Sequence, residues 1–484
     1  MKRISEDGEG TIPRRDFLRT VGAATAAVSL ASSRVSAADK VAAASSPPGR
    51  PATVRVAFVY PPSEQLRQEG YYSWPGAGFD AEARQKQYTA GLRQLEQDLG
   101  MQLVIEDGPL DTQAQVTKFI SDVKASKPDG LLLIPFKKGH WPHVVRIIDE
   151  TSLPAIVLAT LGVLLVPSVR QLHRRPGVYM ISSPDNLDAV AKGLRMIRTA
   201  SWMRQSLIVN ITGPEIKEER VPCLETRVRT IPHERFYALF RETPADDQVK
   251  RLAQQYMAGA REIVEPTAAD VVEAAKTYFV LKRIIQEEGA TALMMNCLPG
   301  LKRPHQHVPP CMGFMSLRDE GIAMGCESDL DATLTMMLLQ DLFDRPGFQH
   351  NPAVDTEKNH YFCAHCTSAS KMQGTRGPAE PYALRNHAEA GWGCVPRVLM
   401  RAGQEITVAK YLSGKVPRMI LYTGTVVGCP PIPPTGGCRT NVEATLNEPS
   451  DVCDVQGHHQ TLIYGNFGQD MRTFCQLYGI EIVS

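Results

Sequence analysis

The 484-residue sequence has almost no net charge and no long run of charges of one sign. Lys and Arg total 53, Asp and Glu total 52, and the formal net charge is +1 at pH 7. Proteins that bind nucleic acid or anionic membranes through their overall field have a clearly basic balance. We therefore expect no nucleic-acid partner, whereas a neutral small molecule such as a sugar is compatible with this composition.

The sequence also lacks a clear membrane span and the common phosphate-binding motifs. Residues 153–169 are apolar for about 17 residues, the short limit for a span, but they contain Pro154 and Pro167. We interpret them as a buried strand and its following loop, and expect no membrane contact in the mature protein. No G-x-G-x-x-G follows the first expected strand and no Walker A sequence occurs, so the usual signals of a nucleotide site are missing.

The 11 cysteines are scattered and form no small-domain disulfide framework. Cys429 and Cys438 stand nine residues apart across a Pro/Gly-rich loop, so a disulfide there remains an alternative. "CAHC" at 363–366 has the spacing of a zinc or redox site, but no second C-x-x-C follows. We favour small buried strand residues over a zinc site.

Residues 1–37 have the pattern of an export signal. "PRRDFLRTVGAATAAVSLASSRVSA" contains the pair Arg14 and Arg15, then a weakly apolar Ala-rich stretch, then small residues at a cleavage position. It resembles a twin-arginine signal, and the alternative is a disordered basic N-terminus. We predict export to the periplasm by the twin-arginine route, with residues 38–52 as a linker.

After the linker, strand and helix patterns alternate along the chain. Apolar runs such as "VRVAFVY" and "GLLLIPF" are separated by amphipathic helical stretches. Such alternation predicts parallel sheets covered by helices. We predict an α/β fold with two N-terminal doubly wound parallel-sheet domains, residues 53–205 and 206–310, and a C-terminal mixed α+β catalytic domain with β-barrel-like strands, residues 311–484.

The stretch "GCESDLDATL" sets an acidic residue before a helix expected over residues 328–342. Ser328 is a suitable N-cap, and Asp331 completes a capping-box-like pattern. Glu327 then stands just outside the positive end of the helix, where a carboxylate is favoured. Taken alone, Glu327 is better explained by cap or surface chemistry than by a binding role.

Carboxylates and imidazoles concentrate in the C-terminal third. Asp355 reads as a turn residue, His365 as a core histidine, and His458 and His459 as a polar strand start. Together with Glu327 they offer two carboxylates and two imidazoles, a set suited to Mn²⁺ or a similar divalent ion. Spacing alone does not show that they converge.

The segments "GCESDLDATLTMMLLQ", "AVDTEKN", "CAHC" and "GHHQTLIYGNFGQDMRTFCQLYGIEI" resemble the catalytic region of the L-arabinose isomerase/L-fucose isomerase superfamily. The resemblance implies a metal-dependent aldose–ketose isomerase that acts through an ene-diol intermediate. It assigns metal binding and proton transfer to Glu327 and Asp355, and further metal ligation to His365 and His459. It leaves open which carboxylate is the acid, and it implies a homo-oligomer, a trimer or hexamer.

Two further residues are candidate substrate contacts. His387 lies in a segment similar to one near the family's active site, and Trp74 lies in the aromatic loop "YYSWPGAGFD", which suits stacking on a sugar. The competing hypothesis is an exported, non-catalytic sugar-binding protein. Such a protein would need the two α/β units but not the acid and imidazole residues of the last 170 or so positions.

Overall fold

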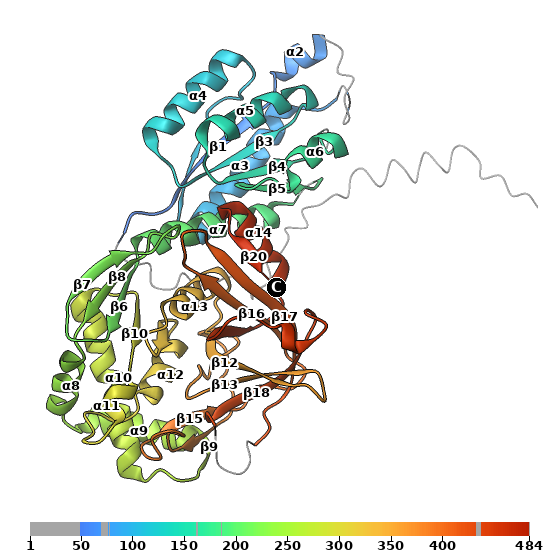
Figure 1. Cartoon of the computed structure of the whole chain (residues 1–484). Helices are drawn as coiled ribbons and strands as arrows, with labels where there is room; N and C mark the ends of the chain where they lie inside the picture. The colour runs from blue at the N-terminus through green and yellow to red at the C-terminus, as the bar shows by residue number, and fades with distance from the viewer. Residues whose placement is uncertain are drawn as a thin grey trace, which may run out of the picture. The chain divides into compact units, whose positions relative to one another are not determined.

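The computed structural model describes residues 49–68, 76, 78–160, 163–184, 186–431 and 437–483 (Figure 1). The predicted export signal, most of the predicted linker and Trp74 lie outside the described residues. No helix in the described part of the chain is both long and apolar enough to cross a membrane.

The first α/β unit is a parallel five-stranded sheet with the strand order β2-β1-β3-β4-β5. Its strands are β1 (Thr53–Val59), β2 (Gln102–Ile105), β3 (Gly130–Pro135), β4 (Ala155–Ala159) and β5 (Val178–Ser182), and its helices are α2 (Ser63–Gln68), α3 (Ala81–Leu99), α4 (Gln113–Ser126), α5 (Trp141–Thr151) and α6 (Val166–His173). In β1, Val56 and Phe58 pack into one hydrophobic cluster while Ala57 and Val59 pack into another. Both faces of the sheet are therefore covered, as the alternating pattern predicted. Residues 153–169 contribute β4 and the start of α6.

The second unit is a five-stranded sheet with the order β11-β10-β6-β8-β7. Its strands are β6 (Leu207–Ile211), β7 (Lys217–Arg220), β8 (Arg227–Ile231), β10 (Ala292–Met295) and β11 (Ala323–Cys326), and its helices include α8 (His233–Glu242), α9 (Asp247–Gly259), α10 (Ala268–Glu288), α11 (Leu298–Leu301) and α12 (Cys311–Asp319). All neighbours are parallel except β7, which pairs antiparallel with β8. The sheet continues past residue 310, where we placed a domain boundary, because β11 pairs with β10.

The C-terminal region contains a six-stranded barrel. Its strands follow the order β16-β19-β12-β13-β18-β17, and pairing between β16 and β17 closes it. They are β12 (Phe348–Asp355), β13 (His360–His365), β16 (Glu405–Leu412), β17 (Arg418–Gly428), β18 (Thr440–Leu446) and β19 (Gln460–Tyr464). The predicted mixed α/β fold with parallel sheets and a C-terminal barrel is therefore confirmed.

Four shorter strands and two helices in the C-terminal half of the chain join these elements. β9 (Ala260–Ile263), β14 (Tyr382–Arg385) and β15 (Val395–Val398) form a small sheet, and β20 (Glu481–Val483) adds to β17; the helices are α13 (Leu330–Phe343) and α14 (Gly468–Tyr478). Helix α14 ends at Gly479, a left-handed C-cap, as predicted from the sequence.

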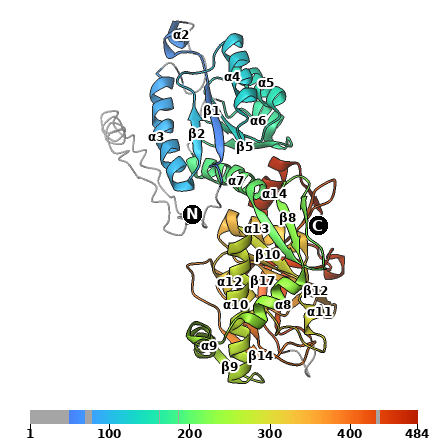
Figure 2. The ribbon, with the colours of Figure 1, turned by 90° about the vertical axis from the view of Figure 1, so that its left-hand side faces the viewer.

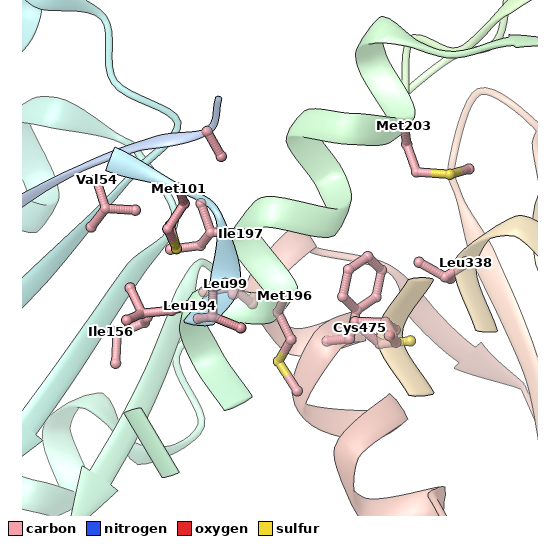
Figure 3. Close-up of a cluster of buried hydrophobic side chains, with 14 of the residues drawn as sticks. Val54, Leu99, Met101, Ile156, Leu194, Met196, Ile197, Met203, Leu338 and Cys475 are labelled. Carbon is pink, nitrogen blue, oxygen red and sulfur yellow. The ribbon is translucent and has the colours of Figure 1, made fainter. Parts of the chain in front are cut away.

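Helix α7 (Leu187–Gln205) packs on both sides. Leu194 and Ile197 lie toward the strands of the first sheet, whereas Met196 and Met203 lie toward α14 and α13 (Figure 3). Figure 2 shows α7 running between the first sheet and those two helices. One hydrophobic core thus continues from the first sheet into the helices beside the barrel.

Polar contacts support the same junction. Asp341 of α13 is buried and accepts hydrogen bonds from Arg198 (3.0 Å) and Thr199 (2.5 Å) of α7. Gln476 of α14 donates to the carbonyl of Val178 at 2.6 Å, and its own carbonyl accepts from the Gly177 amide at 2.9 Å. The last helix of the chain therefore seals the β5 edge of the first sheet.

Candidate metal centre

Glu327 is held by an unusual backbone connection between β11 and α13. Glu327 and Ser328 have φ angles of 57° and 55°, in the left-handed region that residues other than glycine rarely adopt. Such backbone costs on the order of 1–3 kcal/mol per residue and is concentrated at functional sites. The connection turns the chain sharply between the sheet and the helix.

The N-cap of α13 is Asp329, so our assignment of Ser328 as the cap is wrong. The Asp329 carboxylate accepts from the Ala332 amide at 2.8 Å. Ser328 instead donates to the Asn210 side chain at 2.7 Å, and Asp331 accepts from the Ser413 amide at 3.1 Å. With Asp329 capping the helix, the Glu327 carboxylate has no part in the cap.

Glu327 meets two of the predicted histidines. His365 is the last residue of β13, and His459 directly precedes β19 with a φ of 48°. One carboxylate oxygen and one nitrogen from each imidazole all lie within 4.8 Å of one another. Nε2 of His365 lies 3.5 Å from one Glu327 oxygen, and Nε2 of His459 lies 3.6 Å from the other. The structure therefore brings together three of the four predicted ligands.

The imidazole nitrogens that face this cluster have no hydrogen-bond partner among the described residues. Both nitrogens of His365 and Nε2 of His459 are buried and unpaired. Their distances from Glu327 exceed those of a well-formed hydrogen bond, and unpaired buried polar atoms are costly. A cation about 2.0–2.2 Å from one nitrogen of each imidazole and from a Glu327 oxygen would satisfy one nitrogen of each ring. Two imidazoles and one carboxylate suit a divalent transition metal and leave coordination positions for substrate or water.

Asp329 orients His459. Its carboxylate lies 3.0 Å from Nδ1 of His459 and accepts from the Lys410 ammonium at 3.0 Å. Burial opposes ionisation of Asp329, but His459, the Ala332 amide and Lys410 lower its pKa to about 2. The ionised carboxylate accepts a hydrogen bond from the Nδ1–H of His459, which leaves the lone pair of Nε2 directed at Glu327. Such carboxylate–histidine pairs are the usual support of a histidine metal ligand.

The charges within the cluster reinforce one another. The His365 imidazole, with a smaller contribution from His459, lowers the pKa of Glu327 against the effect of burial. Burial lowers the pKa of His365, but Cys326 and Glu327 outweigh it and raise that pKa to about 10. A divalent cation must therefore displace a proton from His365 when it binds.

Asp355 does not join the cluster, which corrects its assignment as a metal ligand and proton carrier. It ends β12, in the turn to β13, where it accepts from the amides of Glu357 and Lys358 at 3.0 and 3.2 Å. Asp355 pairs with His360 in the β12–β13 ladder. His365 is five residues further along β13, a distance of roughly 17 Å at about 3.4 Å per residue.

Asn351 is a residue that our sequence reasoning missed. Its side-chain oxygen is buried without a hydrogen-bond partner among the described residues. It shares a strand face with Gln349, whose amide binds both the N–H (2.9 Å) and the carbonyl (3.1 Å) of Cys326, the residue before Glu327. The sequence around Asn351 gave no sign of a functional residue, because a search for metal-binding carboxylates and imidazoles passes over side-chain amides.

The other histidine candidates have separate environments. His458 is exposed, with its ring centroid 4.1 Å from that of His459, so only one residue of the pair enters the cluster. His387 is buried and accepts from the Ala390 amide at 3.2 Å. Burial, with a smaller contribution from His365, lowers its pKa to about 4. Its contact with a substrate stays a prediction.

The "CAHC" segment does not form a zinc site. Cys363 faces the barrel interior, whereas Cys366 packs with Cys311 and Val395 in a different cluster. All 11 cysteines are free thiols. The segment's contribution to the metal centre is His365 alone.

The chain was compared with known proteins. No protein-family model matches it. Two curated relatives, the sulfoquinovose isomerases of Priestia aryabhattai and Priestia megaterium, are each 21% identical over 280 residues, covering 51% of this chain and 61% of the relative. The chain thus matches about three-fifths of the length of these relatives.

Two solved structures show weak similarity. One is a periplasmic solute-binding protein of an ABC transporter from Actinobacillus succinogenes with bound D-allose, at 9% identity and a TM-score of 0.16, covering 51% of this chain and 78% of that one. The other is a XylFII–LytSN complex, at 8% identity and a TM-score of 0.14, covering 59% of this chain and 100% of that one. TM-scores this low carry no argument about fold or function.

Proposed function

We propose that this protein is a divalent-metal-dependent aldose–ketose isomerase that acts on a sugar. The observation that carries the proposal is the convergence of Glu327, His365 and His459, in which the buried Nε2 atoms of both histidines face the Glu327 carboxylate without a hydrogen bond to any described residue. The distant similarity to sulfoquinovose isomerases supports the same reaction class. It covers half of the chain, so we assign the substrate no further than a sugar or a sugar-like polyol.

The three residues would hold a divalent cation, for which we propose Mn²⁺. The bound cation would polarise the sugar carbonyl and its neighbouring hydroxyl, which would lower the barrier to removing the proton from the carbon that carries the hydroxyl. Glu327 is ionised because its pKa is lowered, so it is able to accept a proton from carbon. His459 stays fixed by Asp329 while this occurs.

The proton transfer is assigned to Glu327 alone, because Asp355 lies in a turn outside the cluster. One carboxylate is able to take a proton from one carbon and return it to the adjacent carbon when both lie on the same side of it, while the hydroxyl proton passes to the carbonyl oxygen directly or through water. This differs from the two-carboxylate scheme implied by the family resemblance, and it is the scheme that the described residues support.

Our proposals for export and for assembly come from the sequence alone. We propose that the N-terminal segment with Arg14 and Arg15 directs the protein to the periplasm, and that the mature protein is a homo-oligomer, as the isomerase resemblance implies.

Metal analysis combined with an isomerase assay tests the proposal. Purified protein is stripped with a chelator and titrated with Mn²⁺, and ketose formation is measured across a panel of aldoses that includes sulfoquinovose. We expect wild-type protein to bind one Mn²⁺ per chain and to form a ketose. Glu327→Gln and His459→Ala should lose both properties, and His458→Ala is the matched control that keeps them. Wild-type metal content in both cluster variants would refute the assignment.

A further inference from the structure

The start of β18 lies beside the end of β13. In this antiparallel pair, His365 lies opposite Thr440 and Ala364 opposite Asn441. Cys366 is the residue after β13, and Cys438 stands two residues before Thr440. Neither cysteine belongs to a strand, so both lie just beyond the paired residues, where the two chain segments run side by side.

The two side chains occupy one small apolar cluster. Cys366 packs with Cys311 and Val395, and Cys438 packs against the same group. The two thiols therefore share one apolar surrounding. Cys366 is buried, whereas Cys438 is only half-buried. A reagent in solution is therefore able to reach Cys438, whereas Cys366 is buried next to it.

The two pairings suggested by sequence spacing are not the ones that the fold brings together. Cys363 faces the barrel interior on the opposite side of β13 from residues such as Ala364. The sulfur of Cys429 accepts from the Met400 amide at 3.1 Å, and Cys429 packs against the barrel core. Neither Cys363 nor Cys429 belongs to the cluster that Cys366 and Cys438 share with Cys311.

We propose that Cys366 and Cys438 are a dithiol–disulfide pair that is oxidised by low-molecular-weight disulfides. The Cys438 thiolate attacks one sulfur of oxidised glutathione, which breaks the glutathione disulfide and releases one glutathione thiol. Cys366 then loses its proton and attacks the Cys438 sulfur of the mixed disulfide, which releases the second glutathione thiol. Two protein thiols are oxidised to one disulfide, and one glutathione disulfide is reduced to two thiols.

The crosslink would join the segment that carries His365 to the start of β18. It closes a loop on the order of 70 residues. A disulfide across a loop of that length lowers the conformational entropy of the unfolded chain and so stabilises the folded protein. We expect oxidation to raise the melting temperature by on the order of 5 °C. This inference stands on the cysteine geometry and does not depend on the proposed function.

The experiment uses the full purified chain. It is reduced, freed of reductant, exposed to oxidised glutathione under native conditions, alkylated and digested, and the crosslinked peptides are sequenced by mass spectrometry. We expect a Cys366–Cys438 crosslink and the rise in melting temperature. Cys366→Ser and Cys438→Ser should each lose both, while Cys363→Ser and Cys429→Ser keep both as matched controls.

Other outcomes would overturn the proposal. These are a Cys363–Cys366 or Cys429–Cys438 crosslink, a glutathione adduct on Cys438 that persists in the wild type, and eleven thiols that all stay free. Peptide sequencing reports on the bond directly, so a variant that folds poorly does not obscure the wild-type result.

Discussion

Replacing Asp329 by Asn should weaken both the fold and the metal centre. Asn is as good an N-cap as Asp, so the start of α13 keeps its capping oxygen. Any change in stability or metal affinity therefore comes from the lost negative charge. The lost carboxylate faces His459 and the Lys410 ammonium, whose side chain is only 8% exposed. The variant therefore leaves a buried cation without its counterion, which is costly.

The magnitude follows from the pKa of Asp329, which contacts in the folded protein lower from 3.8 to about 2. At about 1.4 kcal/mol per pH unit, the ionised form is favoured by about 2.5 kcal/mol. Because the folded pKa is the lower one, this stability is present above about pH 4 and is lost as the pH falls toward 2. We expect Asp329→Asn to lower the free energy of unfolding by about 2–3 kcal/mol at pH 7 and to remove this part of the acid sensitivity.

Metal affinity should fall as well. An Asn side chain is able to rotate its NH₂ toward Nδ1 of His459, which moves the imidazole proton to Nε2 and blocks the ligand nitrogen. Loss of such a supporting carboxylate typically costs 10- to 100-fold in metal affinity. Urea unfolding between pH 3 and 8 and Mn²⁺ titration measure the two effects. Asp331→Asn, in the same helical turn but bonded to Ser413, is the control. Wild-type metal affinity in Asp329→Asn would refute the orienting role.

Three further predictions test separate parts of the molecule. Asp355→Asn should keep wild-type metal content and activity, because its carboxylate caps a turn. A tenfold loss of either would show that Asp355 is part of the metal centre. Asp341→Asn should destabilise the junction of α7 and α13 by about 3–5 kcal/mol in urea unfolding, because the largely buried Arg198 guanidinium loses this counterion and keeps only the Asp341 carbonyl, and a loss below about 1 kcal/mol would contradict that reasoning. Replacing both Arg14 and Arg15 by Lys should keep the protein in the cytoplasm by cell fractionation without changing its melting temperature, and normal export would exclude a twin-arginine signal.

Much of the fold was predictable because apolar periodicity and caps are local signals. The runs at β1 and β3 and the Gly479 stop of α14 were identified in that way. The short strand β11 was not, since Ala323–Cys326 is only four residues long and contains no β-branched or aromatic side chain. Its pairing with β10 is a long-range property that no local pattern encodes.

The site was partly predictable for a related reason. Residue types and order indicated Glu327, His365 and His459, and these three converge. Asp355 failed because the β12–β13 register, not the spacing along the chain, decides how far a strand residue lies from His365. Asp329 was missed because Ser328 is an equally good cap by composition, and only the left-handed backbone at Ser328 moves the cap one residue on.

The contact between Gln476 and the Val178 strand has a consequence for how the protein is made. The two residues are separated by 298 positions. At about 5–20 residues per second, translation takes roughly 15–60 s to travel from one to the other. During that interval the first sheet is attached to the ribosome and its β5 edge is not yet covered by α14. Ribosome-bound intermediates should therefore expose this edge to chaperones until the final segment emerges, and synthesis that stops before residue 468 would leave it open permanently.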